Sequence, residues 1–296
     1  MAVHLGIDIG GTNIACGIVN ENCEIIARSK VKTNSPRPYA EILADIIRAA
    51  ELACAEAEIT PQQLGSIGIG CPGTCNQATG VVEYSNNLGF VNAPLRTDIE
   101  SRFGVPTFLG NDADAAAFGE YCAGAAKGAD TAVVITLGTG VGSGIIIDGK
   151  IYSGSNYAGG EIGHTVIVVD GRPCTCGRRG CFEAYSSATG LVNMTREAAE
   201  KFPESLMAKI IRQEGKVSAR TAYQAMKQGD EAGKSVTDMY VKYLAVGITN
   251  VINIFQPDIL CIGGGVCNEG DTLLIPLKKR SQSRCTPREA LKIPGS

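Results

Sequence analysis

Two stretches far apart in the chain repeat one pattern, and this repetition limits the folds that the sequence can adopt. Residues 3–19 and 131–147 each read as an apolar strand, a turn of small residues and a second apolar strand. The turns are Gly10-Gly11-Thr12, here called the first glycine turn, and the GTG of residues 138–140, the second glycine turn. Such self-similarity predicts a duplicated architecture with one hairpin in each half.

Strand and helix patterns alternate through the rest of the chain. In the first half we predict further strands at 23–31, 66–70 and 105–109, helices at 39–58, 94–102 and 113–126, and loop or hairpin at 74–92. In the second half we predict helices at 186–202, 204–213, 218–228 and 230–254, a strand at 259–262, and a helix at 271–280 that Pro276 interrupts. This alternation predicts an α/β fold with a parallel or mixed sheet.

The length of 296 residues exceeds what one hydrophobic core usually serves, so we predict two α/β domains, residues 1–112 and the larger 113–296. No apolar run reaches the ~20 residues that cross a bilayer, and the N-terminus lacks the basic start of a signal peptide. The net charge of −3 gives no sign of a nucleic-acid or membrane-surface binder. Twelve cysteines without a signal peptide indicate reduced thiols in the cytoplasm.

The first glycine turn has the residue types of a phosphate site. Its glycines let backbone N–H groups approach an anion, and Thr12 and Asn13 add donors. Asp8, at the end of the preceding strand, suits a hydrated Mg²⁺. Taken alone, one such motif is better explained by a tight hairpin turn. The second glycine turn and the glycines at 263–265, which also follow an apolar strand, favour phosphate binding by all three loops.

Two other glycine patterns do not predict nucleotide sites. Glycines at alternate positions from 138 to 144 resemble a dinucleotide motif, but strand-like residues follow them where that motif needs a helix. Gly233-Lys234-Ser235 resembles the end of a P-loop without the preceding strand or the required spacing. We expect the latter to lie on a helix surface.

Asn111 and Asp112 lie where a predicted strand ends and a helix begins, the end of an α/β unit at which ligands usually bind. Asp112, ionised at neutral pH, could accept a hydroxyl proton late in phosphoryl transfer. The alternative is that Asp112 only caps the helix. Asp114 is a competing acid, but two positions further on it would point elsewhere around the helix.

The segment 159–183 contains the most specific signal, a ligand set for structural zinc. His164, Cys174, Cys176 and Cys181 supply one imidazole and three thiolates within one loop. A disulfide is the alternative, but Cys174 and Cys176 are too close in sequence to pair comfortably. Glu161 precedes His164 by one helical turn, so both can face one side. Bound to zinc, the ring of His164 would have its second nitrogen oriented toward a sugar hydroxyl.

Together these motifs resemble the ROK family of repressors, uncharacterised frames and sugar kinases, and within it the bacterial glucokinases. The resemblance covers nearly the whole chain. It rests on DIGGTN at 8–13, LGTGVGSG at 137–144, GGEIGH at 159–164, CTCGRRGCFEAYSSATG at 174–190 and GGG at 263–265.

The resemblance implies the actin-like, hexokinase-like fold, in which two α/β domains enclose a cleft, and transfer of the γ-phosphoryl group of ATP to a sugar hydroxyl with Mg²⁺. Asp112 would take the proton from the 6-hydroxyl. The sugar would be bound by Asn111, Asp112, Glu161, His164 and Glu183, with Gly80 and Asn87 nearby. Zinc would be bound by His164, Cys174, Cys176 and Cys181. ATP would be bound by Asp8, Gly10, Gly11, Thr12, Asn13, Gly138, Thr139, Gly140, Gly264 and Gly265.

Glucose is the expected substrate, and N-acetylmannosamine, N-acetylglucosamine or another hexose is the alternative. A sugar-sensing repressor would need an N-terminal helix-turn-helix, whereas the first strand here starts at Val3. Family members form dimers or tetramers, so we expect a homo-oligomer. They also continue into a further C-terminal helix, whereas this sequence ends in CTPREALKIPGS.

Overall fold

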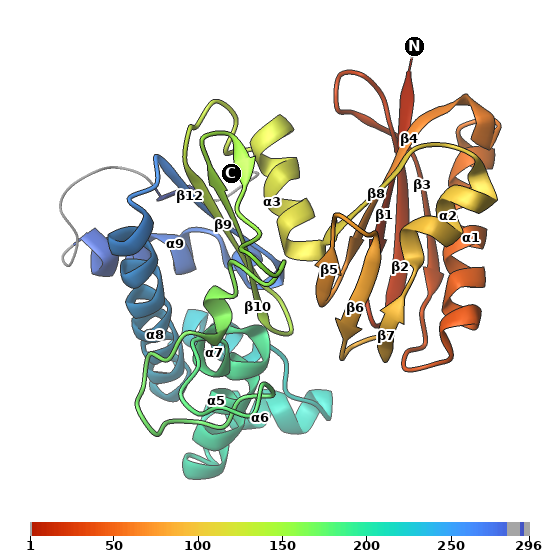
Figure 1. The fold of residues 1–296 in the computed structure, drawn as a ribbon. Coiled ribbons are helices and arrows are strands. Elements are labelled where there is room, and N and C mark those ends of the chain that lie inside the picture. The colour runs from red at the N-terminus through yellow and green to blue at the C-terminus, as the bar shows by residue number, and fades with distance from the viewer. Residues whose placement is uncertain (1, 283–290, 293–296) are drawn as a thin grey trace. The chain divides into compact units, whose positions relative to one another are not determined.

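The computed structural model describes residues 2–282 and 291–292, so most of the C-terminal CTPREALKIPGS lies outside the described residues (Figure 1). The chain divides into two compact units. Unit 1 contains Met1–Ala123 and Ile151–Gly160, and unit 2 contains Gly124–Lys150 and Glu161–Ser296. Compact units need not coincide with functional domains, so the predicted domains 1–112 and 113–296 stay a prediction.

Unit 1 is built on a five-stranded sheet with the order β3-β2-β1-β4-β8. Its strands are β1 (Val3–Ile9), β2 (Asn13–Val19), β3 (Ile25–Lys32), β4 (Leu64–Cys71) and β8 (Thr107–Asn111). The hairpin β1–β2 is antiparallel, and β1, β4 and β8 run parallel. The carboxyl ends of these three strands therefore meet at one edge of the sheet.

Unit 2 repeats this design with the order β11-β10-β9-β12-β13. The strands of this sheet are β9 (Ala132–Leu137), β10 (Val141–Ile147), β11 (Lys150–Ile151, of which only Lys150 is counted in unit 2), β12 (Ile259–Gly263) and β13 (Leu291–Lys292). The hairpin β9–β10 is antiparallel, and β9, β12 and β13 are parallel. The duplicated α/β architecture predicted from the two hairpins is confirmed.

The core of unit 1 lies between one face of its sheet and the helices α1 (Tyr39–Glu56) and α2 (Leu95–Phe103). Leu5, Ile7 and Ile9 alternate toward this face, as the period of a strand requires. Helix α1 presents Ile42 and Ile46 to them at a spacing of one helical turn, and both are fully buried. Burying each such side chain contributes about 1.5–3 kcal/mol.

The stretch 74–92, predicted as loop or hairpin, forms a small three-stranded antiparallel sheet. It consists of β5 (Thr74–Asn76), β6 (Val81–Ser85) and β7 (Phe90–Ala93). Helix α3 (Asp112–Ala123) follows β8 directly and completes the regular structure of unit 1.

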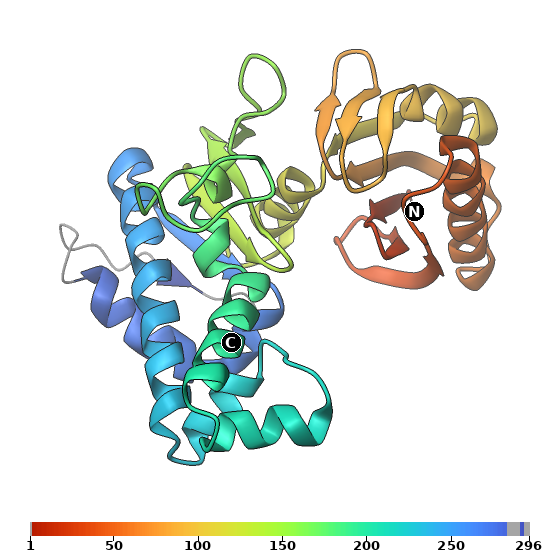
Figure 2. The same cartoon turned by 90° about the horizontal axis from the view of Figure 1, so that it is seen from below.

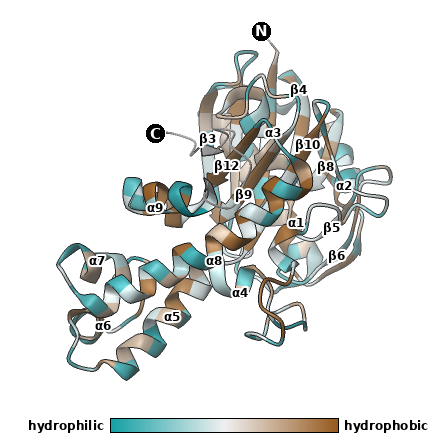
Figure 3. Cartoon of the chain, turned by 90° about the vertical axis from the view of Figure 1, so that its left-hand side faces the viewer, coloured by the Kyte–Doolittle hydropathy of each residue, from teal (hydrophilic) through white to brown (hydrophobic). Residues whose placement is uncertain are grey.

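Unit 2 covers its apolar strands with helices. They are α4 (Glu183–Ser186), α5 (Ala188–Lys201), α6 (Leu206–Glu214), α7 (Thr221–Lys227), α8 (Glu231–Phe255) and α9 (Asp271–Gln282). Strands β9 and β12 are hydrophobic (Figure 3), and the long helix α8 lies alongside α5 (Figure 2). Gly233-Lys234-Ser235 lies in the first turns of α8, as expected of a helix. No helix in the described part of the chain is both long and apolar enough to span a bilayer.

The predicted interruption at Pro276 is wrong, because α9 continues through this residue to Gln282. Proline removes one helical hydrogen bond and normally kinks a helix. Here Leu273 and Leu277, one turn apart on either side of it, are fully buried in the core of unit 2. Their packing outweighs the local preference of proline.

Candidate active site

The first glycine turn connects β1 to β2, and the segment after β3 fixes its conformation. Each carbonyl oxygen of the turn accepts a hydrogen bond from that segment. The hydroxyl of Thr33 donates to Gly10 at 2.6 Å, the N–H of Thr33 to Thr12 at 3.0 Å and the N–H of Ser35 to Gly11 at 3.3 Å. All three carbonyl oxygens of the turn therefore accept hydrogen bonds from the single segment after β3.

Asp8 and Asp112 lie at the same edge of the unit 1 sheet. Asp8 pairs with Gly70 of β4, and Gly70 pairs with Gly110 of β8. The two positions beside Asp8 in this row are therefore glycines, and Asp112 follows two residues after Gly110. A Cβ on Gly70 would lie 3.4 Å from the Cα of Asp112 and 3.3 Å from the Cβ of Ala115, closer than most such contacts. Gly70 thus permits helix α3 to begin against the sheet, a role that its sequence context did not reveal.

Asn111 is the cap of helix α3. Its Oδ1 accepts from the N–H groups of Ala113 at 2.9 Å and Asp114 at 3.3 Å, and its Nδ2 donates to the carbonyl of Gly73 at 3.1 Å. Asp112 is the first helical residue, and its Oδ1 accepts from the N–H of Ala113 at 2.9 Å. Because Asn111 caps the helix, capping alone does not account for Asp112.

The pKa of Asp112 lies above the usual aspartate value. Burial is the largest cause, the negative charge of Asp8 adds to it, and the hydrogen bond from Ala113 acts in the opposite direction. A raised pKa brings a carboxylate closer to the proton affinity that a general base needs near neutral pH. Asp114, the competing acid, is buried with 6% of its surface exposed.

The second glycine turn connects β9 to β10 in unit 2 and is likewise bonded through its carbonyl oxygens. The N–H of Ala188 donates to Gly138 at 2.8 Å, and the hydroxyl of Thr189 donates to Thr139 at 2.7 Å. Within the turn, the N–H of Gly138 donates to Gly140 at 3.0 Å. The start of helix α5 therefore supports this turn.

Glu183 contacts both the second glycine turn and the loop that contains Cys174, Cys176 and Cys181, here called the cysteine loop. Its Oε2 accepts from the N–H of Val141 at 2.9 Å, and its Oε1 lies 3.4 Å from the hydroxyl of Thr175 and 3.7 Å from the Sγ of Cys174. A Cβ on Gly140 would overlap Oε2. This carboxylate, which the sequence suggested only as a sugar ligand, also bonds the backbone beside the turn.

The glycines at 263–265, here called the third glycine loop, pack against the strand that leads into the second glycine turn. Gly264 has a φ of +96°, and a Cβ there would lie 2.5 Å from the carbonyl oxygen of Leu137, the last residue of β9. Only glycine fits without strain at such a position. The structure therefore brings together the predicted ATP residues Gly138, Thr139, Gly140, Gly264 and Gly265 in unit 2.

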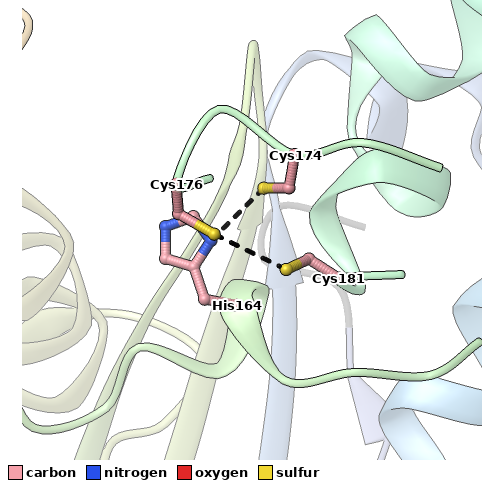
Figure 4. Close-up of side chains that lie close together, drawn as sticks. All are labelled: His164, Cys174, Cys176 and Cys181. Atoms are coloured by element: carbon pink, nitrogen blue, oxygen red, sulfur yellow. Dashed lines mark hydrogen bonds between the residues drawn. The ribbon is translucent and has the colours of Figure 1, made fainter. Parts of the chain in front are cut away.

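The four predicted zinc ligands converge (Figure 4). One ligand atom from each of His164, Cys174, Cys176 and Cys181 lies within 4.8 Å of the other three. The Nδ1 of His164 is 3.6 Å from the Sγ of Cys174, and the Sγ atoms of Cys176 and Cys181 are 3.7 Å apart. Zinc–ligand bonds of about 2.0–2.3 Å give tetrahedral edges of roughly 3.5–3.8 Å, so these separations fit a tetrahedral metal ion.

The cysteine loop takes this shape through short bridges of its own backbone. Val166 pairs with Cys181, and Pro173 pairs with Arg179. Gly180 has a positive φ, and a Cβ there would overlap the carbonyl oxygen of Val168. No disulfide joins the cysteines that the structure describes.

His164 presents its two ring nitrogens to different partners. Nδ1 faces Cys174, and Nε2 lies 4.0 Å from the Oε2 of Glu161. The expectation that Glu161 and His164 face one side is therefore confirmed. A metal bound at Nδ1 would leave Nε2, beside Glu161, for a hydroxyl group.

The predicted site residues divide between the two units. Unit 1 contains Asp8, Gly10, Gly11, Thr12, Asn13, Asn111 and Asp112, whereas unit 2 contains Gly138, Thr139, Gly140, Glu161, His164, Cys174, Cys176, Cys181, Glu183, Gly264 and Gly265. Their functional roles stay predictions. Sequence reasoning missed Thr33, Ser35 and Thr189, whose hydrogen bonds to the turns carry no local sequence signal.

Comparison with known proteins finds the same family that the sequence motifs resemble. The model of the ROK family matches residues 4–290. The glucokinase of Halalkalibacterium halodurans is 36% identical over 288 residues, covering 97% of this chain and 87% of that protein. The N-acetyl-D-glucosamine kinase of Salmonella heidelberg is 32% identical over 276 residues, covering 90% of this chain and 85% of that protein.

A solved structure shares the fold across the chain. The ROK family glucokinase of Streptomyces griseus, crystallised with glucose and AMPPNP, superposes with a TM-score of 0.85 at 32% identity, covering 99% of this chain and 94% of that one. The α/β, actin-like and hexokinase-like fold predicted from the motifs is confirmed. On the family match and these relatives, the chain belongs to the ROK family.

Proposed function

We propose that this protein is an ATP-dependent hexose kinase that converts glucose to glucose 6-phosphate. The observation that carries the proposal is Asp112, a half-buried carboxylate with a raised pKa at the carboxyl end of β8. The similarity to glucokinases supports glucose as the acceptor and ATP as the donor.

In the proposed reaction, Asp112 accepts the proton of the sugar 6-hydroxyl as that oxygen bonds to the γ-phosphorus. The bond from this phosphorus to the oxygen bridging the β- and γ-phosphates breaks, and ADP leaves with the electron pair. Burial, together with the smaller effect of the charge of Asp8, raises the pKa of Asp112 and so strengthens it as a base. N–H groups of the two glycine turns would donate to the phosphates of ATP, and Gly264 and Gly265 would border its nucleoside.

We propose zinc as the ion of the cysteine loop, with a structural role. His164, Cys174, Cys176 and Cys181 would bind it, and the ion would fix the ring orientation of His164. The Nε2 of His164 and the carboxylates of Glu161 and Glu183 would then bind sugar hydroxyls, as would Asn111. Mg²⁺ bound with ATP near Asp8 would neutralise phosphate charge.

Replacing the base tests the reaction. Asp112→Asn keeps the shape of the side chain and removes its proton affinity. Loss of a general base should lower kcat by about 10²–10⁴-fold in a coupled ADP-release assay. Asp114→Asn, two residues further along the same helix, is the matched control and should keep most activity. A kcat of Asp112→Asn close to wild type would exclude Asp112 as the base.

A kinase for N-acetylated hexosamines is the second candidate, because the N-acetyl-D-glucosamine kinase of Salmonella heidelberg shares 32% of the aligned residues. The two kinds of substrate differ in the substituent at carbon 2 of the sugar, whereas the phosphoryl group is transferred to the 6-hydroxyl. Measuring kcat/KM for glucose, N-acetylglucosamine and N-acetylmannosamine separates them. A higher value for either acetylated sugar would replace glucose as the proposed substrate.

A further inference from the structure

Each glycine turn receives a hydrogen bond from the hydroxyl of a threonine far away in the sequence. In unit 1, Thr33 donates to the carbonyl of Gly10 at 2.6 Å. In unit 2, Thr189 donates to the carbonyl of Thr139 at 2.7 Å. Neither threonine belongs to the motifs that predicted the phosphate loops.

The backbone beside each threonine bonds the same turn. The N–H groups of Thr33 and Ser35 donate to the first glycine turn at 3.0 and 3.3 Å, and that of Ala188 donates to the second at 2.8 Å. The C=O and N–H of a trans peptide point in opposite directions. Bonds to the carbonyl oxygens therefore fix the direction of the N–H groups, which is what a site for phosphate oxygens requires.

Thr33 is itself held in place on its other side. It is fully buried, and its carbonyl oxygen accepts from Nε and Nη2 of Arg37 at 2.9 and 2.6 Å. Arg37 also forms an ion pair with Asp45 of helix α1. The next hydroxyl, that of Ser35, donates to the carbonyl of Asn87 at 2.6 Å. The first glycine turn is thus connected through this segment to α1 and to the loop before β7.

We propose that Thr33 and Thr189 are positioning residues, which orient the N–H groups of Gly11 and Gly140, in the same peptides as the bonded carbonyls, toward the phosphates of ATP. The inference rests on the proposed kinase function and assigns a role to two residues that the sequence motifs did not predict as ATP ligands. Thr33 should have the larger effect, because the hydroxyl of the buried Thr33 meets less competition from water than that of the exposed Thr189.

Valine substitution removes each hydroxyl and keeps the branched shape. One hydrogen bond contributes about 1 kcal/mol, which corresponds to about 5-fold in KM for ATP for Thr33→Val, and we expect about 2-fold for Thr189→Val. KM for the sugar should stay unchanged. Thr33→Ser and Thr189→Ser keep the hydroxyl and should restore KM for ATP.

Two matched control variants separate an effect on ATP binding from a general loss of stability. Thr107 in unit 1 is buried, and its hydroxyl donates to the carbonyl of Val105 at 3.1 Å. Thr195 in unit 2 is buried and donates to Leu191 at 2.7 Å. Thr107→Val and Thr195→Val should lower Tm to a similar degree and leave KM for ATP at the wild-type value.

Calorimetric titration with AMPPNP and Mg²⁺ gives a readout independent of catalysis. Weaker AMPPNP binding by Thr33→Val, with rescue by serine, supports the positioning role. The positioning role is overturned if Thr33→Val and Thr107→Val have the same KM for ATP and the same Kd for AMPPNP. It is also overturned if Thr33→Ser does not restore the wild-type values. Wild-type protein that binds AMPPNP without phosphorylating any hexose refutes the kinase proposal alone, whereas wild-type protein that binds no AMPPNP refutes both.

Discussion

Replacing Gly140 by alanine should displace Glu183. The Cβ of alanine would overlap Glu183 Oε2 and lie 3.1 Å from its Cδ. Since the backbone of Gly140 is outside the left-handed region, the substitution itself causes no φ strain. The flexible side chain of Glu183 must therefore move, and the N–H of Val141 loses the acceptor that it has at 2.9 Å.

The magnitude follows from two opposing terms. A hydrogen bond to a charged group contributes about 1.5–3 kcal/mol to the free energy of unfolding. Alanine in place of glycine reduces the entropy of the unfolded chain and returns about 0.4–1 kcal/mol. We expect Gly140→Ala to lower the free energy of unfolding by ~0.5–2.5 kcal/mol. Gly138→Ala is the matched control, because nothing lies within 4 Å of its Cβ position.

A double-mutant cycle in urea tests the cause. The four proteins are wild type, Gly140→Ala, Glu183→Ala and the double variant. If the overlap with Glu183 is the whole effect, Gly140→Ala should be neutral or stabilising once Glu183 is alanine, giving a coupling free energy of about 1.5–3 kcal/mol. An equal loss from Gly140→Ala in both backgrounds would refute the reasoning.

Three further predictions concern the base, the metal and the third glycine loop. Because the pKa of Asp112 is raised, its protonated form favours folding. That contribution is complete below the unfolded pKa of about 3.9 and is lost as pH rises through the folded pKa. Asp112→Asn should therefore raise Tm relative to wild type at neutral pH, with the difference shrinking toward pH ~4; a difference independent of pH would contradict this. Elemental analysis should find about one zinc per chain, and Cys176→Ser should lower both zinc content and Tm, whereas the exposed Cys23→Ser should change neither. Gly264→Ala should lower the free energy of unfolding by ~1–3 kcal/mol, because of the φ of +96° and the contact with Leu137. Gly263→Ala and Gly265→Ala, whose Cβ positions are open, should leave it nearly unchanged. Equal urea midpoints for all three variants would disprove the steric argument.

The sequence predicted best those features that local residues determine. Both hairpins follow from alternating apolar residues around glycine, and the metal cluster follows from four ligands within one loop. Long amphipathic segments such as α8 were also placed within a residue or two of their observed ends. In each case the physical cause lies within one short stretch, so its pattern is visible without the fold.

The features that were missed depend on contacts across the chain. The hydrogen bond from Thr33 to Gly10 and that from Val141 to Glu183 join segments with no shared periodicity. Continuation of α9 through Pro276 depends on the burial of Leu273 and Leu277. Propensity reasoning has no access to such tertiary contacts, which decide the outcome at these positions.

The threonine bonds to the two turns also distinguish what the duplicated fold repeats from what it does not. The hairpins occupy equivalent places in the two sheets, but Thr33 directly follows the third strand of unit 1, whereas Thr189 lies well beyond the corresponding strand of unit 2, at the start of α5. The two halves therefore satisfy the same requirement from non-equivalent positions. A threonine hydroxyl bonded to a turn carbonyl is thus a feature that the two hairpins share and that their common topology does not explain.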